Sequence, residues 1–470
     1  MDDCSCEQLG RCFPANFVFG AATAAYQIEG SPHSDGKGES IWDRFCRRPG
    51  AIDRGESGDV ACDHYRLWRE DVAVMRSLGL EAYRFSVAWS RVQPNGMGEA
   101  NLAGLAFYDR LVDGLLEAGI MPFLTLYHWD LPQALQDRGG WGEREIASRF
   151  ADYAAILARA LGDRVTHFTS LNEPWNFAFE GHLFGHHPPG KHDPWLAMRV
   201  VHHSILAHAE AQAAIKAERP EAQVGIALSV SPKIPATASR RDAVAARKAD
   251  LAMNRLYLDP ILRGAYADEA KRLCGPFFPQ VRAEDEALIA STKPGFLGIN
   301  TYTRERARFA WNIPWFQFWV DADDVPEAEF ELDGAQYTNM GSEVYPPALR
   351  QMLERLRDEY GNPPVFVTEN GASFHDELEG DEVHDPKRVA YLEDYLAEAA
   401  TAVKGGCDLR GYFFWSLMDN FEWTYGYTKQ LGLVYVDYAT QRRVVKDSGK
   451  AYARIIAAHR AAGSGREVGA

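Results

Sequence analysis

Eight short apolar runs alternate with segments of helical spacing along this chain. This alternation limits the fold more than any other feature, because a strand, a helix and a second strand form a unit whose strands run parallel. Eight such units close into an α/β fold, the single (β/α)₈ or TIM barrel, with its active site at the carboxyl ends of the strands. The strand candidates are 17–27, 82–89, 121–128, 165–172, 224–229, 296–303, 365–369 and 411–417, and the helical segments include 102–118, 143–161, 194–219, 346–360 and 386–403.

Length and composition agree with one large domain. The chain has 470 residues, of which 46% are hydrophobic and 25% charged, so it can bury a large core and still face water. Barrels of this class commonly exceed the usual length of one domain, and no low-complexity linker divides the sequence. We expect a flexible segment at 1–12, the barrel over 13–462 and a flexible tail at 463–470.

The charge and the cysteines exclude several classes of function. A formal net charge of −16 argues against nucleic acid or an anionic membrane as partner, because both attract clustered basic side chains. The seven cysteines are scattered and odd in number, which does not indicate a disulfide framework. Cys4, Cys6 and Cys12 lack the spacing of a metal site, so no metal is expected. Residues 1–11 lack the apolar stretch of a secretory signal, and we expect a cytoplasmic protein.

Polar residues gather where the predicted strands end. Glu173 and Glu369 each follow an apolar run, and two carboxyls at strand ends suggest glycoside hydrolysis, in which one group moves a proton and the other attacks the anomeric carbon. Asn172 can reach a sugar 2-hydroxyl, while Arg84 and Tyr302 can hold the second carboxyl ionised. Any one of these side chains can instead be a structural hydrogen-bonding group. Their occurrence on nearly every strand favours a site.

The motifs around these positions resemble those of the β-glucosidases of glycoside hydrolase family 1 over nearly the whole chain. The motifs are AATAAYQIEG at 21–30, YRFSVAWSR at 83–91, HWDLP at 128–132, NEP at 172–174, NTY at 300–302, TENG at 368–371 and WSLMDNFEW at 415–423.

The resemblance implies a retaining double displacement with Glu369 as nucleophile, Glu173 as acid/base, and Arg84 and Tyr302 supporting the nucleophile. The substrate would be a small β-glycoside, such as cellobiose or an aryl glucoside, with galactosides and fucosides as further candidates. No cofactor is implied. The expected substrate-binding residues are Gln27, His128, Trp129, Asn172, Asn300, Tyr302, Trp415, Glu422 and Trp423.

Two positions depart from the family pattern. Leu431 replaces an aromatic residue that would border the C6 end of the sugar, and Ser342 replaces a tryptophan that would form a platform for the leaving group. The aromatic residues between Trp311 and Trp319 could supply that platform or form a small core that pins their loop.

Two other functions remain open from the sequence. A 6-phospho-β-glucosidase would have to bind a phosphate close to Glu422, which is electrostatically unfavourable. A non-catalytic sugar-binding protein on the same scaffold would need neither Glu173 nor Glu369. Release of nitrophenol from an unphosphorylated β-glucoside separates all three functions.

Overall fold

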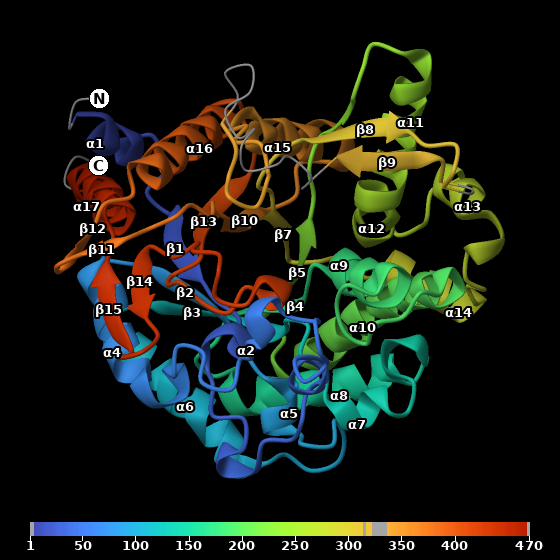
Figure 1. Ribbon diagram of the computed structural model, residues 1–470, viewed down its shortest axis with the longest axis horizontal. Helices are drawn as coiled ribbons and strands as arrows, with labels where there is room; N and C mark the ends of the chain where they lie inside the picture. Colours follow the sequence, from blue (N-terminus) through green and yellow to red (C-terminus); the bar gives the residue numbers. More distant parts are fainter. Residues whose placement is uncertain (1–3, 314–315, 322–335, 468–470) are drawn as a thin grey trace.

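The computed structural model, which describes residues 4–313, 316–321 and 336–467, confirms the predicted barrel (Figure 1). Eight parallel strands close in the order β1-β13-β10-β7-β5-β4-β3-β2. Their carboxyl ends meet on one face, because all of them run in the same direction. The barrel strands are β1 Val18–Ala22, β2 Ala82–Ser86, β3 Met121–Tyr127, β4 His167–Asn172, β5 Gln223–Ser229, β7 Phe296–Asn300, β10 Val365–Asn370 and β13 Leu409–Trp415.

Helices surround the strands as the alternation predicts (Figure 1). The five predicted helical segments are present with shifted ends. The longer helices are α4 His64–Ser77, α6 Leu102–Glu117, α8 Ile146–Leu161, α10 Pro194–Glu218, α11 Arg240–Asp250, α14 Ala283–Ser291, α15 Pro347–Tyr360, α16 Pro386–Lys404 and α17 Asp447–Glu467. Within the ranges described above, no helix is long and apolar enough to cross a membrane.

Among the described residues, short strands outside the barrel form three small sheets. They are β6 Lys233–Pro235 with β8 Glu305–Phe309 and β9 Phe318–Asp321, β11 Leu378–Glu379 with β12 Glu382–Val383, and β14 Val434–Asp437 with β15 Arg442–Val445. Strands β8 and β9 pack beside α11, at the upper right of Figure 1.

The first predicted strand is too long at its carboxyl end. Strand β1 stops at Ala22, and the chain then forms the short helix α2 (Ala25–Ile28). The backbone amide of Ala25 donates to the Ser86 hydroxyl at 2.7 Å, which anchors the start of this helix on strand β2. The turn directs Gln27 over the end of the barrel, where its side chain is fully buried.

The chain ends are helical where the structure describes them, and the flexible segments expected at 1–12 and 463–470 stay predictions. Residues Cys4–Arg11 form helix α1, which packs against α17. The contact is so close at Gly10 that a Cβ atom there would lie 2.2 Å from the carbonyl oxygen of Ile455. Helix α17 continues to Glu467, into the expected tail. The division into domains at 13 and 462 stays a prediction.

Aromatic rings fill the barrel beneath the carboxyl ends of the strands. The ring of Phe123, which is fully buried, lies 5.0–5.3 Å from the rings of Phe296, Phe366 and Phe413. Glycines make room for them: a Cβ on Gly225 would lie 2.5 Å from Phe296. This apolar floor excludes water from below, so polar groups above it sit in a medium of low polarity.

We predict that Phe123→Ala lowers the free energy of unfolding by about 3–5 kcal/mol, because three neighbouring rings would line the resulting cavity. Chemical denaturation measures the loss. The matched control is Leu102→Ala, whose side chain is 77% exposed and whose loss should cost no more than about 0.5 kcal/mol. Equal losses in the two variants would contradict the assignment of the aromatic floor as the barrel core.

Candidate active site

Glu173 stands at the turn between strand β4 and helix α9 (Pro174–Phe179). Its backbone has φ 45° and ψ 61°, a left-handed conformation that is rare outside glycine. Pro174 fixes the first helical position, and the Glu173 amide donates to the carbonyl oxygen of Ala227 on β5 at 2.9 Å. Strained backbone of this kind is typical of functional sites. The side chain is 6% exposed.

Glu369 lies at the end of strand β10 and is paired with a cation. Arg84 from strand β2 is fully buried, and its Nη1 donates to Glu369 Oε1 at 2.7 Å. The Tyr302 hydroxyl donates to Glu369 Oε2 at 2.8 Å. Both carboxylate oxygens therefore accept a hydrogen bond, and one bond is charge-assisted.

A network of amides joins the two carboxyls. Asn300 Nδ2 donates to Glu173 Oε1 at 2.8 Å and to Asn172 Oδ1 at 3.1 Å, while Asn300 Oδ1 accepts from the Thr368 hydroxyl at 2.6 Å. Asn172 Oδ1 also accepts from Arg84 Nη2 at 2.6 Å. These bonds fix which end of each amide is oxygen and which is nitrogen.

The two carboxyls differ in their electrostatic surroundings. Burial raises the pKa of Glu173 to about 8, and the charge of Glu369 adds to the rise. Burial also raises the pKa of Glu369, but the charge of Arg84 and the hydrogen bonds from Arg84 and Tyr302 oppose that rise. When the pair holds one proton, the proton therefore resides on Glu173 and the charge on Glu369.

His128 and three tryptophans form one wall of the site. Asn172 Nδ2 donates to His128 Nε2 at 3.0 Å. Burial lowers the pKa of His128 well below its usual value, so the ring is neutral and its proton resides on Nδ1. The ring centroid of His128 lies 5.5 Å from that of Trp415 in a stacked arrangement and 6.0 Å from that of Trp423, and Trp129 lies 4.7 Å from Trp423.

Gln27 and Glu422 form the neighbouring part of the site. Gln27 Nε2 donates to the carbonyl oxygen of Phe421 at 2.9 Å, to Asn420 Oδ1 at 3.0 Å and to Glu422 Oε2 at 3.3 Å. Burial raises the pKa of Glu422 to about 8, with a contribution from the charge of Glu369. The sequence-predicted site residues thus come together at the carboxyl ends of the strands.

Three buried polar atoms of this site have no hydrogen-bond partner within the described part of the chain. They are Gln27 Oε1, an acceptor, and His128 Nδ1 and Arg84 Nε, both donors. Buried polar groups are normally paired, because an unpaired one loses its interaction with water. A ligand with several hydroxyl groups, each of which donates and accepts, matches the acceptor of Gln27 and the donor of His128.

Asn176 was not among the residues predicted from the sequence. Its Nδ2 donates to Glu173 Oε2 at 2.8 Å, opposite the bond from Asn300. An amide three positions after Glu173, in the first turn of a helix that begins with Pro174, is the signal that could have found it.

The two departures from the family pattern lie in different surroundings. Leu431 is buried and belongs to an apolar cluster with Trp415, against which Tyr302 packs. Ser342 lies in a turn, where its carbonyl oxygen accepts from the amide of Thr338 at 2.9 Å. The roles of both residues in selectivity stay predictions.

The described aromatic residues between Trp311 and Trp319 are partly packed in a small core and partly exposed. Phe318 packs against a small cluster that includes Ala245 and Ala307, as expected for a core that pins the loop. Trp311 and Trp319 are 81% and 50% exposed. Trp315 lies outside the described residues. The loop as a leaving-group platform stays a prediction.

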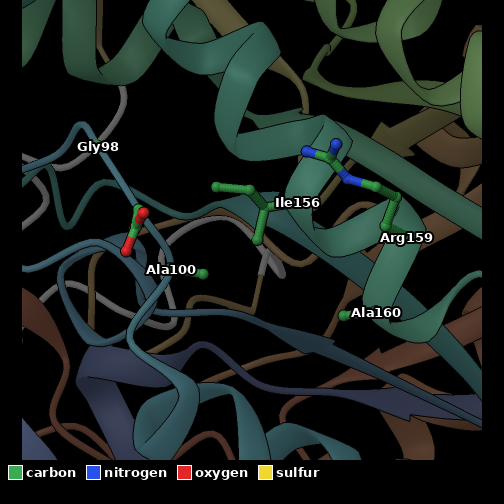
Figure 2. Close-up of a pocket in the computed structure, with 6 residues that line it drawn as sticks. Gly98, Ala100, Ile156, Arg159 and Ala160 are labelled. Carbon is green, nitrogen blue, oxygen red and sulfur yellow. The ribbon is translucent and has the colours of Figure 1, made fainter.

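A hollow of about 460 Å³ between helix α8 and the loop before α6 lacks the paired carboxyls of this site (Figure 2). Its residues come from no barrel strand and include a single carboxyl, that of Glu99; they are Gly98, Glu99, Ala100, Ile156, Arg159 and Ala160. Among the described residues, no group of three or more His, Cys, Asp or Glu side chains could hold a metal ion.

Comparison with known proteins identifies the family of the chain. The family model described as glycosyl hydrolase family 1 matches residues 9–461. "Beta-glucosidase A" of Thermotoga maritima is 43% identical over 446 residues, 94% of this chain and 97% of the relative. A "bifunctional beta-D-glucosidase/beta-D-fucosidase" of Bifidobacterium breve is 43% identical over 466 residues, 96% of this chain and 99% of the relative.

A solved structure, "family 1 b-glucosidase from Thermotoga maritima", superposes with a TM-score of 0.90 at 43% identity and covers 95% of this chain and 98% of that one. The match extends from the barrel to the strand ends that carry the two carboxyls. The chain belongs to glycosyl hydrolase family 1.

Proposed function

We propose that this chain is a retaining β-glucosidase that removes terminal, non-reducing β-D-glucosyl residues from small glycosides. The observation that carries the proposal is the unlike setting of two buried carboxyls. Glu369 contacts the Arg84 guanidinium, whereas Glu173 is held by the amides of Asn300 and Asn176. A carboxylate and a carboxylic acid are what the first step of a double displacement requires. The relatives named β-glucosidase support the choice of sugar.

In the proposed first step, the Glu369 carboxylate attacks the anomeric carbon while the bond to the leaving oxygen breaks. Glu173 gives its proton to that oxygen, so the leaving group departs as a neutral alcohol and Glu173 becomes a carboxylate. The positive charge on Arg84 stabilises the Glu369 carboxylate before attack.

In the proposed second step, water attacks the anomeric carbon of the glycosyl–Glu369 ester. Glu173, now ionised, accepts a proton from that water, and Glu369 leaves as a carboxylate beside Arg84. Glu173 returns to its acid form. The same side chain must therefore function in both protonation states, which fits a pKa close to the working pH.

We assign the sugar hydroxyls to the polar wall of the site. Gln27 Oε1 and His128 Nδ1 offer an acceptor and a donor that have no other partner in the described part of the chain. Glu422 adds a second acceptor beside Gln27, and Asn172 lies next to the acid. Trp415 supplies an apolar surface for the sugar ring. We assign no cofactor to this reaction.

We also propose a cytoplasmic location. Cys12, Cys46, Cys62, Cys274 and Cys407 are free thiols, as expected in a reducing compartment.

A panel of nitrophenyl glycosides tests the proposed function. We predict release of nitrophenol from the β-glucoside, and also from the β-fucoside, since the apolar Leu431 beside Trp415 needs no 6-hydroxyl partner. We predict that kcat/KM for the 6-phosphorylated β-glucoside is about 100-fold lower, because the phosphate would lie near the carboxyl of Glu422.

Glu422→Ser serves as the control in that panel. It should lower kcat/KM for the plain glucoside about 10-fold, because Gln27 loses a hydrogen-bonding neighbour. It should also reduce the ratio of kcat/KM for the plain glucoside to kcat/KM for the phosphorylated one. Faster turnover of the phosphorylated substrate by the wild type would reject the proposal, and turnover of neither substrate would favour a sugar-binding protein.

We predict that Glu173→Ala slows hydrolysis of cellobiose about 10²–10⁴-fold more than it slows glycosylation of the enzyme by dinitrophenyl glucoside. The reason is that a good leaving group departs without a proton. Pre-steady-state release of dinitrophenol isolates that first step. Equal losses on the two substrates would remove Glu173 from the acid role.

A further inference from the structure

The carboxyl of Glu173 is held on both of its oxygens, by two amides of different character. Asn300 donates to Oε1 from the end of strand β7 and is itself held by Asn172 and Thr368. Asn176 donates to Oε2 at 2.8 Å from helix α9. Asn176 is half-buried, and its Oδ1 has no hydrogen bond with any described residue. One amide is thus part of the buried network, whereas the other comes from a partly exposed residue of helix α9.

The position of Asn176 follows from the local backbone. Glu173 precedes helix α9, Pro174 occupies its first position, and the backbone amide of Asn176 donates to the carbonyl oxygen of Glu173 at 2.9 Å. The same residue therefore binds Glu173 twice, once through the backbone and once through the side chain. The left-handed conformation of Glu173 directs the helix so that residue 176 returns over the carboxyl.

On this geometry, and resting on the function proposed above, we propose that Asn176 is a positioning residue that orients the acid/base carboxyl of Glu173 and stabilises its ionised form for the second step. Two fixed amide donors define the plane of the carboxyl. The N–H group of Asn176 favours the carboxylate over the acid, because only the carboxylate uses the bond at full strength. No bond to the substrate is required.

Several charged or titratable groups face Glu173 and must be considered together. Glu369 and Glu422 disfavour its ionisation, and Arg84 favours it. Tyr302, bonded to Glu369, stays neutral because burial and the charges of both catalytic carboxyls raise its pKa well above the usual value. Burial and two like charges thus push Glu173 towards the acid form, and the amides oppose them. Without Asn176, the pKa of Glu173 should rise.

The test compares Asn176→Leu, which keeps the approximate shape but has no donor, with Asn176→Asp, which places a carboxylate against Glu173. For the wild type, kcat/KM falls at high pH as Glu173 loses its proton. We expect this alkaline limb to move to higher pH in Asn176→Leu and further in Asn176→Asp, because both changes disfavour the Glu173 carboxylate. Asn176→Gln, which keeps the amide, should return the limb towards the wild-type position.

Leaving-group dependence provides the second readout. At neutral pH, Asn176→Leu should lower kcat/KM about 10-fold for cellobiose and less than about 2-fold for dinitrophenyl glucoside, since only the poor leaving group needs the oriented proton. Thermal unfolding verifies that the variants are folded. An unchanged alkaline limb, or equal losses on both substrates, would overturn the role of Asn176. A wild-type enzyme that hydrolyses no β-glucoside would instead reject the proposed function.

Discussion

The ion pair between Arg84 and Glu369 is the interaction on which the rest of the site depends. It joins strand β2 to strand β10 inside the barrel, and its two side chains are 0% and 5% exposed. A buried ion pair is costly to form, and removal of one partner leaves an unpaired charge that costs about 3–5 kcal/mol. Arg84 also binds Asn172 on strand β4, so one guanidinium links its own strand to two others.

This ion pair makes two identical side chains chemically different. Both carboxyls are buried above the same aromatic floor, where ionisation is unfavourable. Arg84 and Tyr302 relieve that penalty at Glu369, and the resulting negative charge increases it at Glu173. The amide of Asn300 then holds the Glu173 carboxyl at the end of strand β7. The division into nucleophile and acid that we propose is therefore a property of the surroundings.

The sequence predicted the barrel because strand and helix periods are local signals. It could not place all boundaries: residues 17–27 read as one apolar run, yet the strand ends at Ala22, where a bond from Ala25 to the distant Ser86 starts a helix. Helix α1 was not predicted for a related reason, since it depends on a close approach to α17 at Gly10. Contacts between residues far apart in sequence leave no periodic pattern.

The residues of the site also differ in whether the sequence could predict them. Glu173 and Glu369 were predictable because each stands at a strand end in a recognisable motif, and Arg84 because its strand carries such a motif. Asn176 was missed because its position, half-buried on the first turn of α9, looks like an ordinary polar helical residue until the left-handed turn at Glu173 is known. The selectivity expected from Leu431 and Ser342 depends on the shape of a bound sugar and its leaving group, which sequence patterns do not encode.

Covalent trapping tests the central claim, that Arg84 and Tyr302 hold Glu369 as the ionised nucleophile, most directly. A 2-deoxy-2-fluoro-β-glucoside with a good leaving group should glycosylate the protein and then hydrolyse slowly, because fluorine destabilises the oxocarbenium-like transition state of both steps. Peptide mass spectrometry should place the sugar on Glu369. A label on Glu173 or on any other residue, or turnover without a covalent intermediate, would contradict the account.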